Sequence, residues 1–115
     1  MSRVTKSNIA KKKHKKILNS TKGQYGARSR LYKTAKQSNI KSLQYAFRDR
    51  KNRKRSFRSL WIARITAALN HIELNYSKLI KLLSDKEILL NRKILSDLAV
   101  NDNKTFLKII EKAQN

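Results

Sequence analysis

The chain has 115 residues, with 29 Lys and Arg against 7 Asp and Glu, and its net charge is +22. This charge far exceeds what solubility requires and favours binding to polyanions. The sequence has no Cys and only two His, which excludes a disulfide framework and a cysteine metal site and argues against a histidine metal cluster. It contains no apolar run suited to a secretory signal or a membrane span, so we expect neither.

The charge is concentrated in the first half of the chain. Residues 1–64 hold 21 bases and one acid, whereas residues 65–115 hold 8 bases and 6 acids. The absence of Pro and the presence of only two Gly predict an almost wholly helical chain. The predicted fold is therefore all-α, with a long basic helical extension over residues 1–59 and a small helical domain over residues 60–115.

The extension is predicted to form two helices. The first spans about Ser7 to Ser20 and carries KKKHKK, Lys11–Lys16, a run that fits polyanion binding better than a solvated or targeting patch. Both glycines fall in GQYG, Gly23–Gly26, which predicts a turn. From Ala27 to about Asn70 there is no strong breaker, which indicates one very long helix, straight or bent. At ~1.5 Å per residue, 40 residues would reach about 60 Å.

The segment RDRKNRKRSFR, Arg48–Arg58, has seven bases in eleven residues. In a helix its charges point in nearly every direction, unlike those of a membrane-surface helix. Seven like-charge pairs three or four residues apart together destabilise an isolated helix by roughly 1.5–3.5 kcal/mol. The segment is thus either disordered or surrounded by anions, and nucleic acid is the obvious polyanion. We expect the free extension to be largely unfolded. Circular dichroism showing a fully helical free chain at moderate salt would contradict this.

Aromatic residues are interleaved with the Lys and Arg residues. Aromatic rings can stack on unpaired nucleobases, while Arg binds phosphates through paired N–H groups. Some of the rings can instead pack against neighbouring helical turns. The choice stays open for Tyr45 and Phe47. Trp61 is expected in the domain core, with an edge left for RNA. Asp49 is expected to form an ion pair that orients Arg53, and His14 to hydrogen-bond RNA.

The second half reads as a compact cluster of helices. Apolar residues recur on one face after Asn75, after Asn91 and after Asp102, and each of these three residues precedes its predicted helix. Asn75 and Asn91 are predicted N-caps flanked by hydrophobic staples. With the run Leu60–Leu69 they supply a four-helix cluster whose core is small and marginally stable. We find no nucleophile–base pair, glycine-rich phosphate loop or paired carboxylates, so we predict no catalysis and no cofactor.

Several blocks of this sequence resemble a known family. HKKIL, KGQYGARSRLY, QYAFRDRKNRKRSFRSLWIARI, NYSKLI and NRKILSDLAV, in this order, closely resemble the bacterial-type L20 family of large-subunit ribosomal proteins. The resemblance spans nearly the whole chain. It implies an extension threaded into large-subunit ribosomal RNA, a helical domain at the subunit's outer side and a scaffolding role in early assembly, beside neighbouring ribosomal proteins. It also implies localisation to the ribosome of a bacterium or a plastid, and in some members repression of their own messenger.

The candidate RNA-binding residues are basic or aromatic and lie in residues 1–64. They are Arg3, Lys6, Lys11, Lys12, Lys13, His14, Lys15, Lys16, Lys22, Tyr25, Arg28, Arg30, Tyr32, Arg48, Arg50, Lys51, Arg53, Lys54, Arg55, Arg58, Trp61 and Arg64. A general histone-like or chaperone-type nucleic-acid-binding protein is the alternative interpretation of the same composition. A membrane-active peptide is excluded, because the Arg48–Arg58 segment lacks the apolar face that such a peptide requires.

The sequence departs from the family at the end of the long helix. Where the family typically reads N-G-[IL]-S-Y-S, this chain has Glu73 in place of Gly. The loss of Gly removes the usual helix stop. We therefore expect the end of the long helix to be shifted or to lack a left-handed cap.

Overall fold

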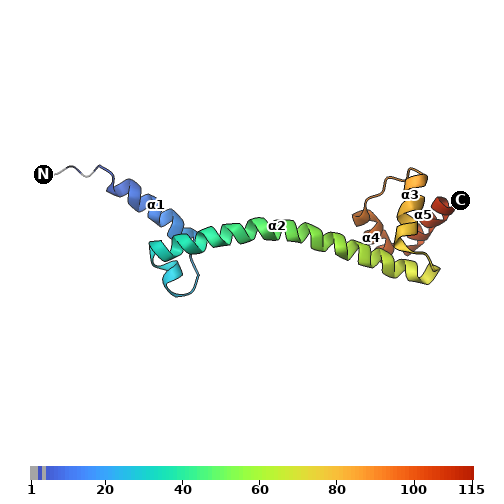
Figure 1. Cartoon of the computed structure of the whole chain (residues 1–115), viewed down its shortest axis with the longest axis horizontal. Helices are drawn as coiled ribbons and strands as arrows, with labels where there is room; N and C mark the ends of the chain where they lie inside the picture. The colour runs from blue at the N-terminus through green and yellow to red at the C-terminus, as the bar shows by residue number, and fades with distance from the viewer. Residues whose placement is uncertain (1–2, 4) are drawn as a thin grey trace. The chain divides into compact units, whose positions relative to one another are not determined.

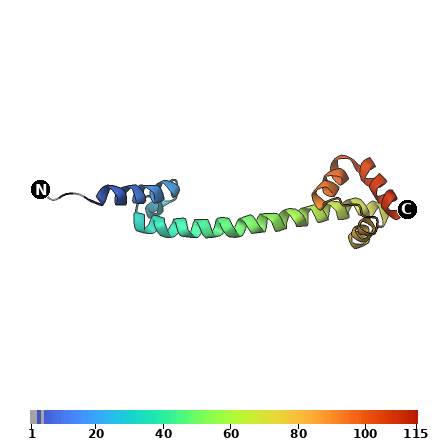
Figure 2. The same cartoon turned by 90° about the horizontal axis from the view of Figure 1, so that it is seen from above.

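The structure, a computed structural model, describes residue 3 and residues 5–115 (Figures 1 and 2). The described part contains five α-helices, two short 3₁₀ turns and no strand, which confirms the all-α prediction. The helices are α1 Ser7–Ser20, α2 Tyr32–Leu69, α3 Tyr76–Asp85, α4 Arg92–Asn101 and α5 Asn103–Gln114, and the 3₁₀ turns are Gly26–Ser29 and Asn70–Ile72. The chain divides into two compact units, Met1–Lys51 and Asn52–Asn115, and α2 contributes to both.

The turn after α1 forms where the two glycines predict it. α1 has the predicted bounds, and the buried Thr21 closes it by donating its hydroxyl to the carbonyl of Leu18 at 3.2 Å. Gly23 and Gly26 have φ of 88° and 64°, in the left-handed region that residues with a Cβ rarely adopt. The GQYG prediction is therefore confirmed, because both glycines are needed for the backbone of this turn.

α2 begins at Tyr32, five residues later than the absence of breakers after Ala27 indicates. The intervening chain forms a 3₁₀ turn that brings the start of α2 beside α1 (Figure 2). Ser20 of α1 donates to the side chain of Asn39 at 3.2 Å, and Ala35, in the first turn of α2, is fully buried. These tertiary contacts fix the start of α2, since local helix propensity alone would have extended it.

The core of the second unit joins α2 to the three helices that follow it, which confirms the predicted four-helix cluster. Two residues come from α2, two from α3, one from α4 and three from α5. The buried residues are Ile65, Leu69, Leu79, Leu83, Leu95, Phe106, Ile110 and Ala113. Both predicted hydrophobic staples belong to this cluster through Leu79 and Leu95, with Leu74 and Leu90 packed against it.

The helix caps differ in their hydrogen bonds. The side chain of Asn91 accepts from the N–H of Ile94 at 2.9 Å, and that of Asp102 accepts from the N–H of Thr105 at 3.1 Å. Asn75 occupies the N-cap position of α3, but its side chain accepts no hydrogen bond there. The predicted N-cap positions are thus confirmed at both Asn75 and Asn91, and the capping hydrogen bond from the side chain forms only at Asn91.

The cap of α5 predicts a pH-dependent stability. The hydroxyl and the N–H of Thr105 donate to the Asp102 carboxylate and hold its pKa below the ordinary value of 3.8. A carboxyl with a lowered folded-state pKa stabilises the fold above its unfolded pKa, and this contribution disappears as the pH falls through the folded pKa. We expect Asp102→Ala to lower Tm at neutral pH, and the difference from wild type to shrink as the pH falls below 3.8.

Thermal unfolding followed by circular dichroism between about pH 2 and about pH 7 measures this effect. Asp102→Asn is the matched control, because it keeps a cap oxygen but cannot titrate. A deficit of Asp102→Ala that does not change with pH would contradict the assignment.

The connection after α2 ends in a left-handed residue, contrary to expectation. Glu73 has φ of 55° and ψ of 28° and follows the 3₁₀ turn Asn70–Ile72. The chain here turns from Leu69 to Leu79, both in the core. Core packing therefore enforces the left-handed cap even though the residue is not Gly.

A second glutamate ends α3 in the same conformation. Glu87 has φ of 53°. Its N–H donates to the backbone carbonyl of Ser84 at 3.1 Å, and the N–H of Ile88 donates to the backbone carbonyl of Leu83 at 2.9 Å. These two bonds form a Schellman motif, in which Gly is the favoured left-handed residue. Ile88 packs against the core beside this motif.

Both left-handed glutamates are sites where Gly should stabilise the protein. A left-handed residue with a Cβ is disfavoured by roughly 1–2 kcal/mol, and the greater freedom of unfolded Gly offsets part of this. We expect Glu73→Gly and Glu87→Gly each to raise the free energy of unfolding by about 0.5–1 kcal/mol in denaturant titrations. Glu73→Ala and Glu87→Ala are the controls, because they remove the charge but keep the Cβ. Equal gains from Ala and Gly would instead assign the effect to charge.

Candidate nucleic-acid interface

The basic residues of α1 and the following loop lie on open surface. All the candidate residues from Arg3 to Arg30 are exposed. The six residues Lys11–Lys16 fill more than one and a half turns of α1, so their charges spread around the helix. Tyr25 is 97% exposed on the glycine-flanked loop, where its ring packs on nothing. This part of the chain therefore presents charge and one ring to a partner.

The Arg48–Arg58 segment is helical throughout, inside α2, and all seven of its bases are exposed. Asp49 pairs with Arg48, whose Nε lies 3.0 Å from Oδ1, and both side chains are 60% exposed. The predicted pairing with Arg53 is wrong, because the adjacent guanidinium reaches the carboxylate first. An ion pair this exposed contributes roughly 0–1 kcal/mol, so the helix keeps almost its full positive field.

Four cation–ring contacts along α2 were missed by the sequence reasoning. Their distances to the ring centroids are 5.0 Å for Lys41 on Tyr45, 4.7 Å for Arg48 on Tyr45, 4.6 Å for Lys51 on Phe47 and 5.8 Å for Arg53 on Phe57. The spacing of these residues could have predicted the contacts, because each cation lies three or four residues from its ring and therefore on the same face of the helix.

These contacts change the energy balance of the helix. At roughly 0.5–1 kcal/mol each at exposed sites, they supply about 2–4 kcal/mol. The like-charge repulsion of the Arg48–Arg58 segment is of similar size, roughly 1.5–3.5 kcal/mol. The exposed rings of Tyr45, Phe47 and Phe57 thus help a helix of this charge to form.

Two candidate aromatic residues are half-buried. Tyr32 stacks on His14 with ring centroids 3.9 Å apart and an interplanar angle of 22°, so these candidates from α1 and α2 are brought together. The partner of the His14 ring in the structure is therefore Tyr32. Trp61 pairs with Phe57 at 6.3 Å, and the predicted place for Trp61 in the core is wrong because the buried cluster begins one turn later, at Ile65. Arg64, just before the core, is exposed.

The charges of the remaining residues are nearly balanced. Residues 65–115 carry 8 bases and 6 acids. Arg92 is held within the unit, since its Nε donates to the Tyr76 hydroxyl at 2.7 Å and ties the start of α4 to the start of α3. Among the described residues, no three His, Cys, Asp or Glu side chains are grouped so that they could hold a metal ion. None of the helices in the described residues 3 and 5–115 has the length and apolar character needed to cross a membrane.

Comparison with known proteins agrees with this basic, helical organisation. Residues 3–109 match the family model described as "Ribosomal protein L20". The "Large ribosomal subunit protein bL20" of Marinobacter nauticus (strain ATCC 700491 / DSM 11845 / VT8) is 53% identical over 114 residues, which cover 99% of this chain and 97% of that protein. The family match covers the basic helices and all of the core except Ile110 and Ala113, and the relative matches nearly the whole chain. The chain therefore belongs to the ribosomal protein L20 family.

Proposed function

We propose that this chain is a structural constituent of the large ribosomal subunit, that it binds large-subunit ribosomal RNA directly, and that it supports early assembly of the subunit. One observation carries the proposal: all 21 bases of residues 1–64 are exposed, and Asp49 is the one acid among them. The family membership and the large-subunit name of the relative support the same function.

The two parts of the chain would act differently on the RNA. Residues 1–59 form the proposed RNA-threading extension, in which Arg side chains bind phosphates through paired N–H groups and Lys side chains act as point charges. Each phosphate neutralised releases counterions, which makes binding strong and salt-dependent. Residues 60–115 form the proposed globular domain, whose core in α2–α5 consists of apolar side chains.

The proposed role is scaffolding rather than catalysis. Charge that points in many directions from one helix is satisfied when RNA segments approach it from several sides. A helix of this kind would hold together RNA segments that otherwise repel one another, which is what early assembly requires. Neighbouring large-subunit proteins are the further proposed partners.

Competition binding with the full chain tests the function. The chain is bound to labelled large-subunit ribosomal RNA at about 0.3 M salt, where non-specific phosphate contacts are weakened. An excess of mixed duplex DNA or of transfer RNA is then added. We expect the ribosomal RNA complex to survive both competitors. Equal displacement by all polyanions would instead favour a general charge-driven binder.

A further inference from the structure

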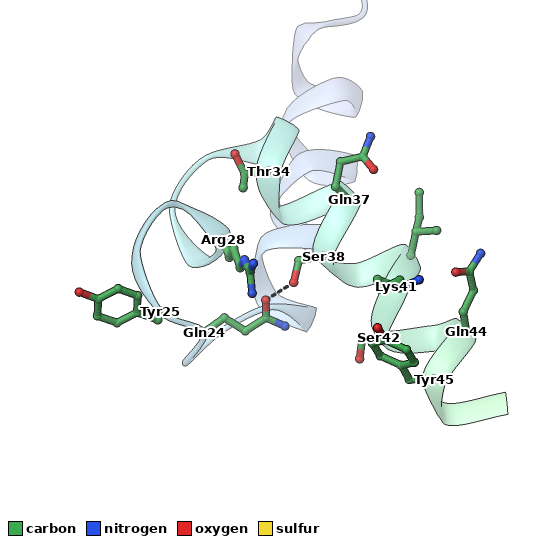
Figure 3. A pocket seen from close by; sticks show the side chains of 11 residues that line it. Gln24, Tyr25, Arg28, Thr34, Gln37, Ser38, Lys41, Ser42, Gln44 and Tyr45 are labelled. Carbon is green, nitrogen blue, oxygen red and sulfur yellow. Dashed lines mark hydrogen bonds between the residues drawn. The ribbon is translucent and has the colours of Figure 1, made fainter. Parts of the chain in front are cut away.

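The first unit contains a hollow between the loop after α1 and the first half of α2 (Figure 3). Its volume is about 900 Å³, and it is open to solvent. Gln24, Tyr25 and Arg28 line it from the loop, and Ser38, Lys41 and Tyr45 line it from α2. A hollow of this size is large enough for a nucleotide, and because it is open on one side it can admit a residue of a longer chain.

One hydrogen bond orients the polar groups inside the hollow. The Ser38 hydroxyl donates to the amide oxygen of Gln24 and thereby joins the loop to α2. With that oxygen engaged, the amide nitrogen of Gln24 is left to donate to an occupant. Figure 3 shows Arg28 extending from the loop toward the same pair. Two donors of this kind, one of them charged, match an occupant that is rich in acceptor oxygens.

The rim of the hollow carries a ring whose faces are uncovered. Tyr25 is 97% exposed and lies between two left-handed glycines, and in Figure 3 its ring points away from α2. The other ring, Tyr45, already has Lys41 and Arg48 within 5.0 Å of its centroid. Tyr25 is therefore the ring that can stack on an incoming planar group.

The chemistry of the lining selects the occupant. No carboxylate lines the hollow, and two cations, three amides, three hydroxyl-bearing Ser and Thr residues and two tyrosines do. Cations bind a phosphate, amides hydrogen-bond the edges of a base, and a ring stacks on its face. A paired base in an RNA helix offers no free face to a ring, whereas an unpaired base in a loop or bulge does.

We infer that this hollow binds one unpaired nucleotide of RNA, with Tyr25 stacked on its base and Arg28 and Lys41 on its phosphate. The inference rests on the proposed function and adds a specific contact to it. The Lys and Arg side chains elsewhere on α1 and α2 bind phosphates of paired and unpaired RNA alike. The hollow distinguishes unpaired from paired RNA and so helps to set the register of the extension.

Chemical probing of the RNA tests the inference. Acylation of ribose 2′-hydroxyl groups marks unpaired nucleotides of large-subunit ribosomal RNA, alone and bound to the full-length wild type, Tyr25→Phe, Tyr25→Ala or Phe47→Ala. Phe47 is the matched control, since it is an exposed ring on α2 that does not line the hollow. Tyr25 packs on nothing, so its replacement leaves the fold intact.

We expect wild type, Tyr25→Phe and Phe47→Ala to protect the same unpaired nucleotide, and Tyr25→Ala to lose that protection alone. Affinity of Tyr25→Ala should fall by at least about fivefold, as for loss of one stacked base. Identical protections with Tyr25→Ala and wild type would overturn the inference and leave the proposed function standing. If wild type itself protects no nucleotide of this RNA, both fail.

Discussion

Replacing the seven bases of Arg48–Arg58 with Gln is expected to lower the affinity of the chain for large-subunit ribosomal RNA by at least about a thousandfold near 0.1 M salt. Each base that neutralises a phosphate adds about 0.7–0.9 to the slope of log affinity against log salt, so the slope should fall by roughly 5–6. All seven residues lie in α2 with exposed side chains, and the carboxylate of Asp49 is the one negative charge among them. Fluorescence titration at several salt concentrations measures both quantities.

Residues 65–115 supply a control with the same charge change. They carry seven exposed lysines, whose replacement by Gln removes the same formal charge from the chain. These lysines are Lys78, Lys81, Lys86, Lys93, Lys104, Lys108 and Lys112. If net charge alone drove binding, as in a histone-like compactor, the two variants would lose affinity equally. We expect the control to lose far less, because acids interspersed among these lysines weaken their field.

Elements with local signals were predictable from the sequence. α1 and the starts of α4 and α5 lie where the sequence predicts them, because capping residues, glycines and apolar periodicity act over a few residues. The four-helix core followed from the same periodicity. The start of α2 was not predictable in this way, since the hydrogen bond of Asn39 with Ser20 of α1 and the burial of Ala35 are tertiary features that no local pattern shows.

Two wrong predictions, at Glu73 and Trp61, arose where packing decided against a local preference. Glu disfavours the left-handed region, yet Glu73 adopts it because the chain must turn between two core residues, Leu69 and Leu79. Trp61 has the spacing of a core residue, but the three helices after α2 cover that helix only from Ile65 onward. No residue pattern within α2 marks where that cover begins.

The candidate interface was predictable in charge but not in detail. Composition identifies the exposed bases, since a small unit has no means of burying so many charges. The cation–ring contacts on α2 were readable from spacing. The hollow beside Tyr25 was not, because it exists only once the loop at Gly23–Gly26 folds back on α2 and Ser38 meets Gln24.

Removing the largest buried side chain of the second unit should abolish its cooperative folding. Phe106 is fully buried on α5 within the core shared with α2, α3 and α4. Phe106→Ala is expected to lower the free energy of unfolding by about 3–5 kcal/mol. A unit of this size has a small core and a stability of only a few kcal/mol, so the variant should be largely unfolded at 25 °C. Hydrogen exchange of the amides in α3–α5 measures this directly.

Two further variants make the result diagnostic of packing. Ile110→Val, in the same core, should lower the free energy of unfolding by only about 0.5–1.5 kcal/mol. The amides of α3–α5 should therefore still exchange their hydrogens slowly in this variant. Leu89→Ala, at a position 95% exposed, should change it by less than about 0.5 kcal/mol. Phe106→Ala should also leave the salt slope of RNA binding nearly unchanged, because the bases of Arg48–Arg58 lie outside the core. Protected α3–α5 amides in Phe106→Ala would show that another contact holds these helices together.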